Sequence, residues 1–108
     1  MNTINYKIYQ LSDLEDKKQL KIAFKDFSWI KDDFDFSYYK NIYQGSLEAD
    51  TDRIKAILDI LFTKFNINPP QDFNGHSLSV SDIIEIDGKY WYCDFVGWKN
   101  ITDLCKEN

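Results

Sequence analysis

The clearest pattern in the chain is a helical repeat of apolar positions in its second half. Apolar residues recur there at the three- and four-residue spacing of one helix face: Ile54, Ile57, Leu58, Leu61, Phe62 and Phe65. Asp50, Thr51 and Asp52 come just before them and offer an N-cap and negative charge at the helix start. The helix ends at residues 66–70, because a residue that precedes proline avoids the helical conformation. The pattern predicts an amphipathic helix whose apolar face joins the core.

A second clear pattern is a β-hairpin. Asp87-Gly88 stands between strand-forming residues at 83–86 and 89–93, and this dipeptide favours a two-residue turn. The turn pairs Ile86 with Lys89 and therefore sets Asp82 opposite Cys93. One face of the hairpin is then expected in the core: Ile84, Ile86, Trp91, Cys93 and Phe95. The other face is richer in hydroxyl groups and is expected to be partly wet: Ile83, Glu85, Tyr90, Tyr92 and Asp94.

Weaker patterns predict the remaining strands and a last helix. Residues 6–11 alternate between apolar and polar types, as a strand does. Residues 38–47 predict another strand, with Gly45 as its β-bulge. Residues 101–106 predict a short terminal helix.

The segment around Leu20 fits two different periods. Residues 15–18 are charged and predict a solvated turn before it. Residues 20–24 alternate as in a strand, but they also begin a helical stripe that continues through Phe27 and Ile30. We expect a short strand here, followed by a helical turn over residues 25–31.

These elements together predict a single domain of the α+β class, residues 1–108. Its expected architecture is a small, mainly antiparallel sheet with helices packed on one face and a C-terminal β-hairpin. The chain has 108 residues, of which 44% are hydrophobic and 17% aromatic. That composition can bury a core without disulfides or a structural metal.

The charge of the chain narrows the class of partner. Its net charge is −5 and its pI about 4.7, which disfavours nucleic-acid binding through a basic patch. An acidic surface favours basic protein partners instead. Residues 1–7 show no export signal, and no apolar stretch approaches the roughly 20 residues of a membrane span. We therefore expect a cytoplasmic protein that does not bind membranes, with Cys93 and Cys105 as free thiols.

Five segments of the chain resemble the YodL-like domain family. They are residues 6–11 (YKIYQL), 43–47 (YQGSL), 62–67 (FTKFNI), 70–82 (PQDFNGHSLSVSD) and 92–98 (YCDFVGW). The family occurs on plasmids, phages and conjugative elements of Firmicutes and has no established enzymatic activity. The resemblance thus implies a mobile-element setting and brings no catalytic residues with it.

The segment GHSLSVSD, residues 75–82, contains the chain's one histidine and suggests hydrolase chemistry. However, His76 and Ser77 are too close in sequence for a catalytic triad, and there is no G-x-S-x-G turn. A structural interpretation fits better: Leu78 and Val80 point inward, while the serines point outward or bond to local backbone. Asp82 then closes the turn at the entrance of the hairpin.

Metal chemistry is the alternative interpretation of the same region. Four residues are of zinc-ligand type: His76, Asp82, Cys93 and Cys105. They lack the spacing of known zinc motifs, so we expect no cofactor, with zinc as the alternative. Asp94 next to Cys93 also disfavours a reactive thiolate. The rival hypothesis is a small metal-binding or hydrolytic enzyme centred on His76, Asp82 and Cys93.

An acidic and aromatic segment is the strongest candidate for a contact surface. Its residues are Asp32, Asp33, Phe34, Asp35 and Phe36. Exposed aromatic rings act as binding hot spots, and carboxylates complement basic grooves. The alternative is that both phenylalanines tuck into the core. A second candidate patch consists of Tyr90, Tyr92 and Trp98.

These observations lead to one functional expectation. We expect a non-catalytic protein-binding module of a mobile genetic element. Its most concrete form is an anti-CRISPR-like inhibitor of a host defence nuclease, such as a CRISPR effector or a restriction nuclease. The inhibitor would cover the basic nucleic-acid-binding surface of that enzyme without contacting nucleic acid itself.

Overall fold

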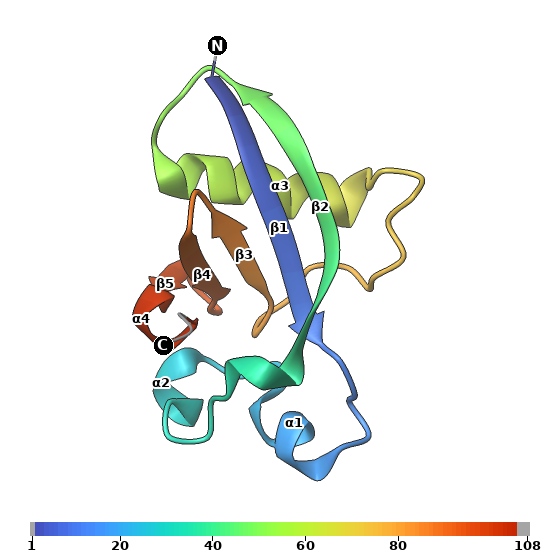
Figure 1. The fold of residues 1–108 in the computed structure, drawn as a ribbon, viewed down its shortest axis with the longest axis vertical. Coiled ribbons are helices and arrows are strands. Elements are labelled where there is room, and N and C mark those ends of the chain that lie inside the picture. Colours follow the sequence, from blue (N-terminus) through green and yellow to red (C-terminus); the bar gives the residue numbers. More distant parts are fainter. Residues whose placement is uncertain (1, 106–108) are drawn as a thin grey trace.

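The first strand of the chain lies inside a five-stranded antiparallel sheet, next to the edge strand. The computed structural model describes residues 2–105, and its strand order is β2-β1-β3-β4-β5 (Figure 1). The strands are β1 (Asn2–Leu11), β2 (Tyr39–Ala49), β3 (Ile83–Ile86), β4 (Lys89–Cys93) and β5 (Trp98–Asn100). The helices are α1 (Lys17–Ile22), α2 (Phe27–Ile30), α3 (Ile54–Ile67) and α4 (Thr102–Cys105), with the 3-10 turn η1 (Phe36–Tyr38). The predicted α+β class with an antiparallel sheet is confirmed.

Helix α3 covers one face of the sheet, behind β1 and β2 in the view of Figure 1. Its buried residues are those of the predicted stripe: Ile57, Leu58, Leu61 and Phe65. The predicted cap is wrong in detail, because Arg53 occupies the N-cap position without a side-chain bond. Thr51 contributes by accepting a hydrogen bond from the Arg53 N–H at 3.1 Å. The helix ends at Ile67, in the segment that the prolines predicted.

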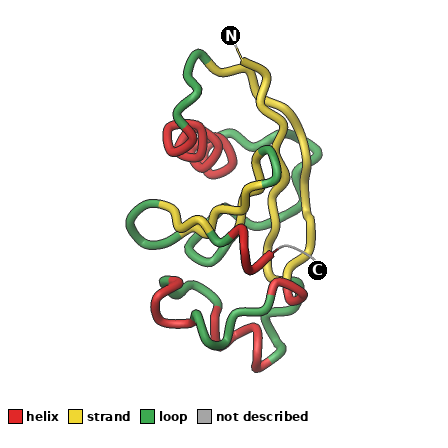
Figure 2. Tube along the Cα trace, turned by 60° about the vertical axis from the view of Figure 1, so that its left-hand side comes forward, coloured by secondary structure: helices red, strands yellow, loops and turns green. Residues whose placement is uncertain are grey.

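The hairpin has the predicted register, with Ile84 opposite Trp91 and Ile86 opposite Lys89. Its second face is partly exposed, as predicted, at Glu85, Tyr90 and Asp94, but not at its other two residues. Ile83 and Tyr92 are fully buried in a second core, which α1, α2 and α4 close from the side opposite α3. The prediction of helices on one face is therefore wrong, and Figure 2 shows α3 and the short helices at separate levels of the molecule. Because alternate residues of a strand point to opposite faces, a sheet covered twice buries both sets.

Residues 20–24 do not form the predicted strand. Helix α1 starts at Lys17, within the segment predicted as a turn, and turns Gln19 and Ile22 inward. Leu20 and Phe24 remain about half exposed. A helix forms here, but the predicted stripe is wrong at Leu20 and Phe24, because α1 ends at Ile22 and turns that residue into the second core instead. The predicted helical turn that follows is confirmed as α2, which buries Phe27 and Ile30.

Strand β2 contains a bulge, but not at Gly45. Ile8 pairs with Tyr43 while Tyr9 pairs with Asn41, which leaves Ile42 as the extra residue. Gly45 lies in regular register, where a Cβ atom would approach the Tyr6 hydroxyl oxygen to 2.9 Å. Glycine is needed there for space.

The end of the chain contains the short helix α4, which runs to Cys105, while the last predicted residue, Lys106, lies outside the described residues. No helix within residues 2–105 has both the length and the apolar character needed to cross a membrane.

Leu61 tests the placement of α3. The Leu61 side chain is fully buried, so Leu61→Ala should lower the free energy of unfolding by about 2–5 kcal/mol. The neighbouring Ile60 is exposed, and Ile60→Ala should stay within roughly 0.5 kcal/mol of the parent. Urea unfolding monitored by circular dichroism measures both. Equal effects at the two positions would contradict the orientation of α3.

Candidate functional site

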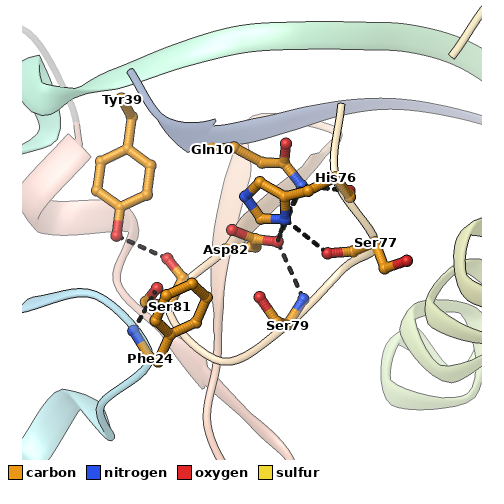
Figure 3. A network of polar contacts seen from close by, with 8 residues as sticks. All are labelled: Gln10, Phe24, Tyr39, His76, Ser77, Ser79, Ser81 and Asp82. Carbon is orange, nitrogen blue, oxygen red and sulfur yellow. Dashed lines mark hydrogen bonds and ion pairs between the residues drawn. The ribbon is translucent and has the colours of Figure 1, made fainter. Parts of the chain in front are cut away.

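The segment GHSLSVSD runs past the end of β1 in the connection from α3 to β3 (Figure 3). Tyr9 pairs with Ile83, and this register brings Gln10, the next residue of β1, beside Asp82. The buried Gln10 amide nitrogen donates to the His76 carbonyl at 2.8 Å and to Asp82 Oδ2 at 3.1 Å. The Gln10 side chain of β1 thus forms hydrogen bonds near both ends of the segment, at His76 and at Asp82.

Asp82 is a buried carboxyl group with few charged neighbours. It is 2% exposed, and its Oδ2 atom also accepts a hydrogen bond from the Ser79 N–H at 3.0 Å. Burial raises the pKa of Asp82 to about 7, and the nearby His76 and the two hydrogen bonds offset only part of that effect. The nearest charged partner is His76 Nδ1 at 4.0 Å, which is too long for a hydrogen bond.

The His76 ring is partly exposed, and one neighbour favours a particular tautomer of the neutral ring. Its Nδ1 atom lies 2.7 Å from the Ser77 carbonyl oxygen, which can only accept a hydrogen bond. Nδ1 therefore carries a proton in this geometry, and its 3.2 Å contact with the Gln10 amide nitrogen joins two donors. The second ring nitrogen, Nε2, remains the basic atom of a neutral His76.

Ser81 joins the segment to two further parts of the chain. The Tyr39 hydroxyl group donates to the Ser81 carbonyl at 2.6 Å, and the Phe24 N–H donates to Ser81 Oγ at 3.1 Å. Ser81 is buried and adopts a left-handed backbone with φ of 84°. The prediction that it points outward or bonds to local backbone is therefore wrong for its side chain, since Ser81 Oγ bonds to the distant Phe24 N–H inside the protein. Burial also raises the pKa of Tyr39.

The cysteines are held in a protonated state. Burial, followed by the charges of Asp82 and Asp94, raises the pKa of Cys93 to about 12. Burial alone raises the pKa of Cys105 to about 12. Such thiols are weak nucleophiles near neutral pH. Within residues 2–105, no three side chains of His, Cys, Asp or Glu are grouped so that they could hold a metal ion.

The phenylalanines of the predicted contact segment pack inward. Phe34 lies 6.3 Å from the Tyr92 ring, and Phe36 lies 5.3 Å from the Tyr90 ring, measured between centroids. Both are partly buried against the second core, as the alternative interpretation expected. Asp32, Asp33 and Asp35 remain exposed.

The second predicted patch does not form one surface. Tyr92 is fully buried, so its prediction as a contact residue is wrong: its ring closes the second core, and its hydroxyl group donates to the Lys25 carbonyl at 2.6 Å. Tyr90 is half-buried against Phe36. Trp98 is half-buried against Phe62, and its ring N–H donates to Asp59 Oδ1 at 3.1 Å.

Four strongly exposed apolar side chains were missed. Trp29 is 81% exposed, Ile67 is 78% exposed, Phe95 is 70% exposed and Val96 is 92% exposed. Phe95 was predicted in the core, but the chain turns away after Asp94 before the strand can continue. One feature of the sequence could have identified this turn, namely Gly97, which has φ of 81° and ends a four-residue connection between β4 and β5.

The sheet, its helices and the loop bonded by Gln10 form a small α+β domain. Comparison with known proteins identifies its family. The model of the YodL-like domain matches residues 5–104, so the chain belongs to this family. It is also similar to "Uncharacterized protein R785" of Acanthamoeba polyphaga mimivirus, with 32% identity over 76 residues, which cover 59% of this chain and 69% of that protein. A search of the solved structures gave no significant match.

Asp82 should make stability depend on pH. Its pKa is about 7 in the folded protein and roughly 3.9 in the unfolded chain. Ionisation of Asp82 therefore destabilises the folded state relative to the unfolded chain. The stability that protonated Asp82 contributes is fully present below about pH 4 and is lost as the pH rises through about 7. The difference between these two pKa values corresponds to a loss of about 4 kcal/mol.

Urea unfolding of the parent and of Asp82→Asn between pH 4 and pH 8 tests this. The asparagine retains an oxygen acceptor and does not titrate, so this variant should gain stability relative to the parent as the pH rises. Asp52→Asn, at an exposed position, serves as the control and should follow the parent. A constant difference between parent and Asp82→Asn across the series would refute the buried, titrating carboxyl group.

Proposed function

We propose that this YodL-like domain is a non-catalytic protein-binding module of a mobile genetic element. In its most concrete form it is an anti-CRISPR-like inhibitor of a host defence nuclease that covers the enzyme's basic nucleic-acid-binding surface. The proposal assigns the protein to the cytoplasm, where such nucleases act, and requires no cofactor. The observation that carries it is an exposed acidic ledge, defined as Asp32, Asp33 and Asp35.

Two partly buried phenylalanines fix the backbone of the acidic ledge. Phe34 and Phe36 alternate with its carboxylates and anchor the segment in the second core. Asp35 accepts hydrogen bonds from the Ser37 hydroxyl at 2.7 Å and the Ser37 N–H at 2.9 Å, which lower the pKa of Asp35. Carboxylates presented on a fixed backbone lose less conformational freedom on binding than those on a mobile loop.

The charge of the ledge fits a basic partner. Within residues 2–105, one of its carboxylates forms an ion pair: Asp33 lies 3.3 Å from Lys21 Nζ at an exposed position. Lys18 is also near enough to Asp35 to contribute to the lowering of its pKa. An exposed pair of this kind adds little stability and leaves the carboxylate available. The net charge of the whole chain, −5, has the same sign as the charge of the ledge. The mimivirus relative supports a setting in a mobile or viral genome.

One observation favours the rival function, a small metal-binding or hydrolytic enzyme. His76 and Asp82 lie together, and His76 Nε2 is the basic atom of a partly exposed ring. Elemental analysis of the dialysed protein distinguishes the two functions. About one equivalent of zinc that disappears in His76→Ala would favour the enzyme and make Asp82 and Cys93 candidate ligands.

Charge reversal of the acidic ledge tests the proposed function. The tagged protein is used to capture partners from cells that carry defence systems, and mass spectrometry identifies the nuclease. Asp32→Lys with Asp33→Lys should then slow association with that purified nuclease about tenfold and flatten its dependence on ionic strength, because such charges steer encounter.

The matched control is Asp50→Lys with Asp52→Lys, which changes the net charge equally on exposed residues before α3. The control should retain most of the parent's association rate. If both double variants slow association equally, net charge alone acts and the ledge is not the contact surface.

A further inference from the structure

Close packing fixes the residue type at position 75. A Cβ atom on Gly75 would overlap the Ile42 side chain and would lie 2.6 Å from Gln10 Oε1. A residue with a side chain would therefore fit there only if β1 or β2 moved. The fold thus requires glycine directly after Asn74, and this creates an Asn-Gly dipeptide in the connection from α3 to β3.

An Asn-Gly dipeptide is chemically labile. Asparagine loses its side-chain amide when the backbone nitrogen of the next residue attacks it, and glycine has no side chain to hinder that attack. Asn74 is the one asparagine of the chain that precedes glycine. Asn41, Asn66 and Asn100 all precede isoleucine, whose branched Cβ crowds the attacking nitrogen.

The groups that take part in this reaction are free in the folded protein. Asn74 is exposed, and Gly75 is partly exposed. Within residues 2–105, neither the Asn74 side chain nor the Gly75 N–H takes part in a hydrogen bond. The dipeptide also lies outside the helices and strands of that part of the chain. The backbone nitrogen and the side-chain amide can therefore approach each other without the loss of any hydrogen bond of their own.

We propose that Asn74-Gly75 is a site of spontaneous deamidation in the folded protein. The Gly75 nitrogen gives up its proton to solvent and bonds to Asn74 Cγ, and ammonia leaves with a proton from solvent, so that a succinimide ring remains. Water then opens this ring. Cleavage of the new N–Cγ bond gives aspartate, whereas cleavage of the original peptide bond gives isoaspartate, whose main chain runs through the side chain. The net change replaces an amide by a carboxylate and consumes only water.

Isoaspartate lengthens the main chain by a methylene group between two fixed points. Before it, Phe73 packs against Phe65 with ring centroids 4.9 Å apart. After it, the His76 carbonyl is held by the 2.8 Å hydrogen bond from the Gln10 amide. The added carbon forces the closely packed Gly75 against β1 and β2, and this weakens the bond between Gln10 and His76. The change needs no partner, so it does not depend on the proposed inhibitor function.

Peptide mapping by mass spectrometry, on protein aged at pH 6 and at pH 8, tests the site. Position 74 should gain the mass of an amide-to-carboxyl change at least about tenfold faster than Asn41. The rate should rise with pH, because the attacking nitrogen must lose its proton. Asn74→Gln should gain almost no mass there, since its longer side chain closes a ring much more slowly. Asn41→Gln is the matched exposed control and should deamidate at Asn74 like the parent.

Urea unfolding separates the effect of the longer main chain from that of the new charge. Anion exchange isolates the deamidated protein, and synthetic peptides calibrate its content of isoaspartate. This fraction should unfold at a lower urea concentration than the fresh parent. Asn74→Asp carries the same charge on a main chain of normal length, and it should unfold like the parent because the Asn74 side chain is exposed.

Two results for the rate would overturn the proposal. One is a mass gain at Asn74 no faster than at Asn41, and the other is deamidation that occurs only in urea, since the fold would then protect Asn74. An Asn74→Asp variant as unstable as the aged protein would refute the weakened bond to Gln10, because the charge alone would then explain the loss of stability.

Discussion

The antiparallel pairing of β1 with both β2 and β3 is the constraint on which the rest of the structure depends. β1 is the only connection between the long edge strand and the C-terminal hairpin within the sheet. Its alternation sends Ile8 to the core under α3 and Tyr9 toward the second core. Its register with β3 also sets Gln10 beside Asp82. A shift by one residue would exchange the two faces and break the contact with the loop.

The polar residues that first suggest hydrolase chemistry serve mainly to hold this arrangement together. Gln10 binds the loop, Asp82 receives its bonds in a buried position, and Ser81 connects the loop to Tyr39 and Phe24. The buried carboxyl group of Asp82 lowers the stability of this polar joint, meaning the contacts of Gln10, Asp82 and Ser81, when it ionises, because a buried carboxylate is poorly solvated. The raised pKa of Asp82 consequently makes the stability of this region depend on pH.

The acidic ledge depends on the buried groups beneath it. Its backbone is held in place because Phe34 and Phe36 pack against the second core. The second core therefore supports both the stability of the fold and the position of the exposed carboxylates.

Local sequence is enough to specify α3 and the hairpin, because a helical stripe and an Asp87-Gly88 turn set backbone geometry through neighbours a few residues apart. It also located the region of the polar joint and the exposed carboxylates of the ledge. Only the tertiary structure decided that Ile22 lies in a helix and that Tyr92 is buried. It alone also decided that Ile42 forms the bulge and that Phe95 is exposed. The physical reason is that burial depends on which distant segments cover a face, and local periodicity carries no information about that covering.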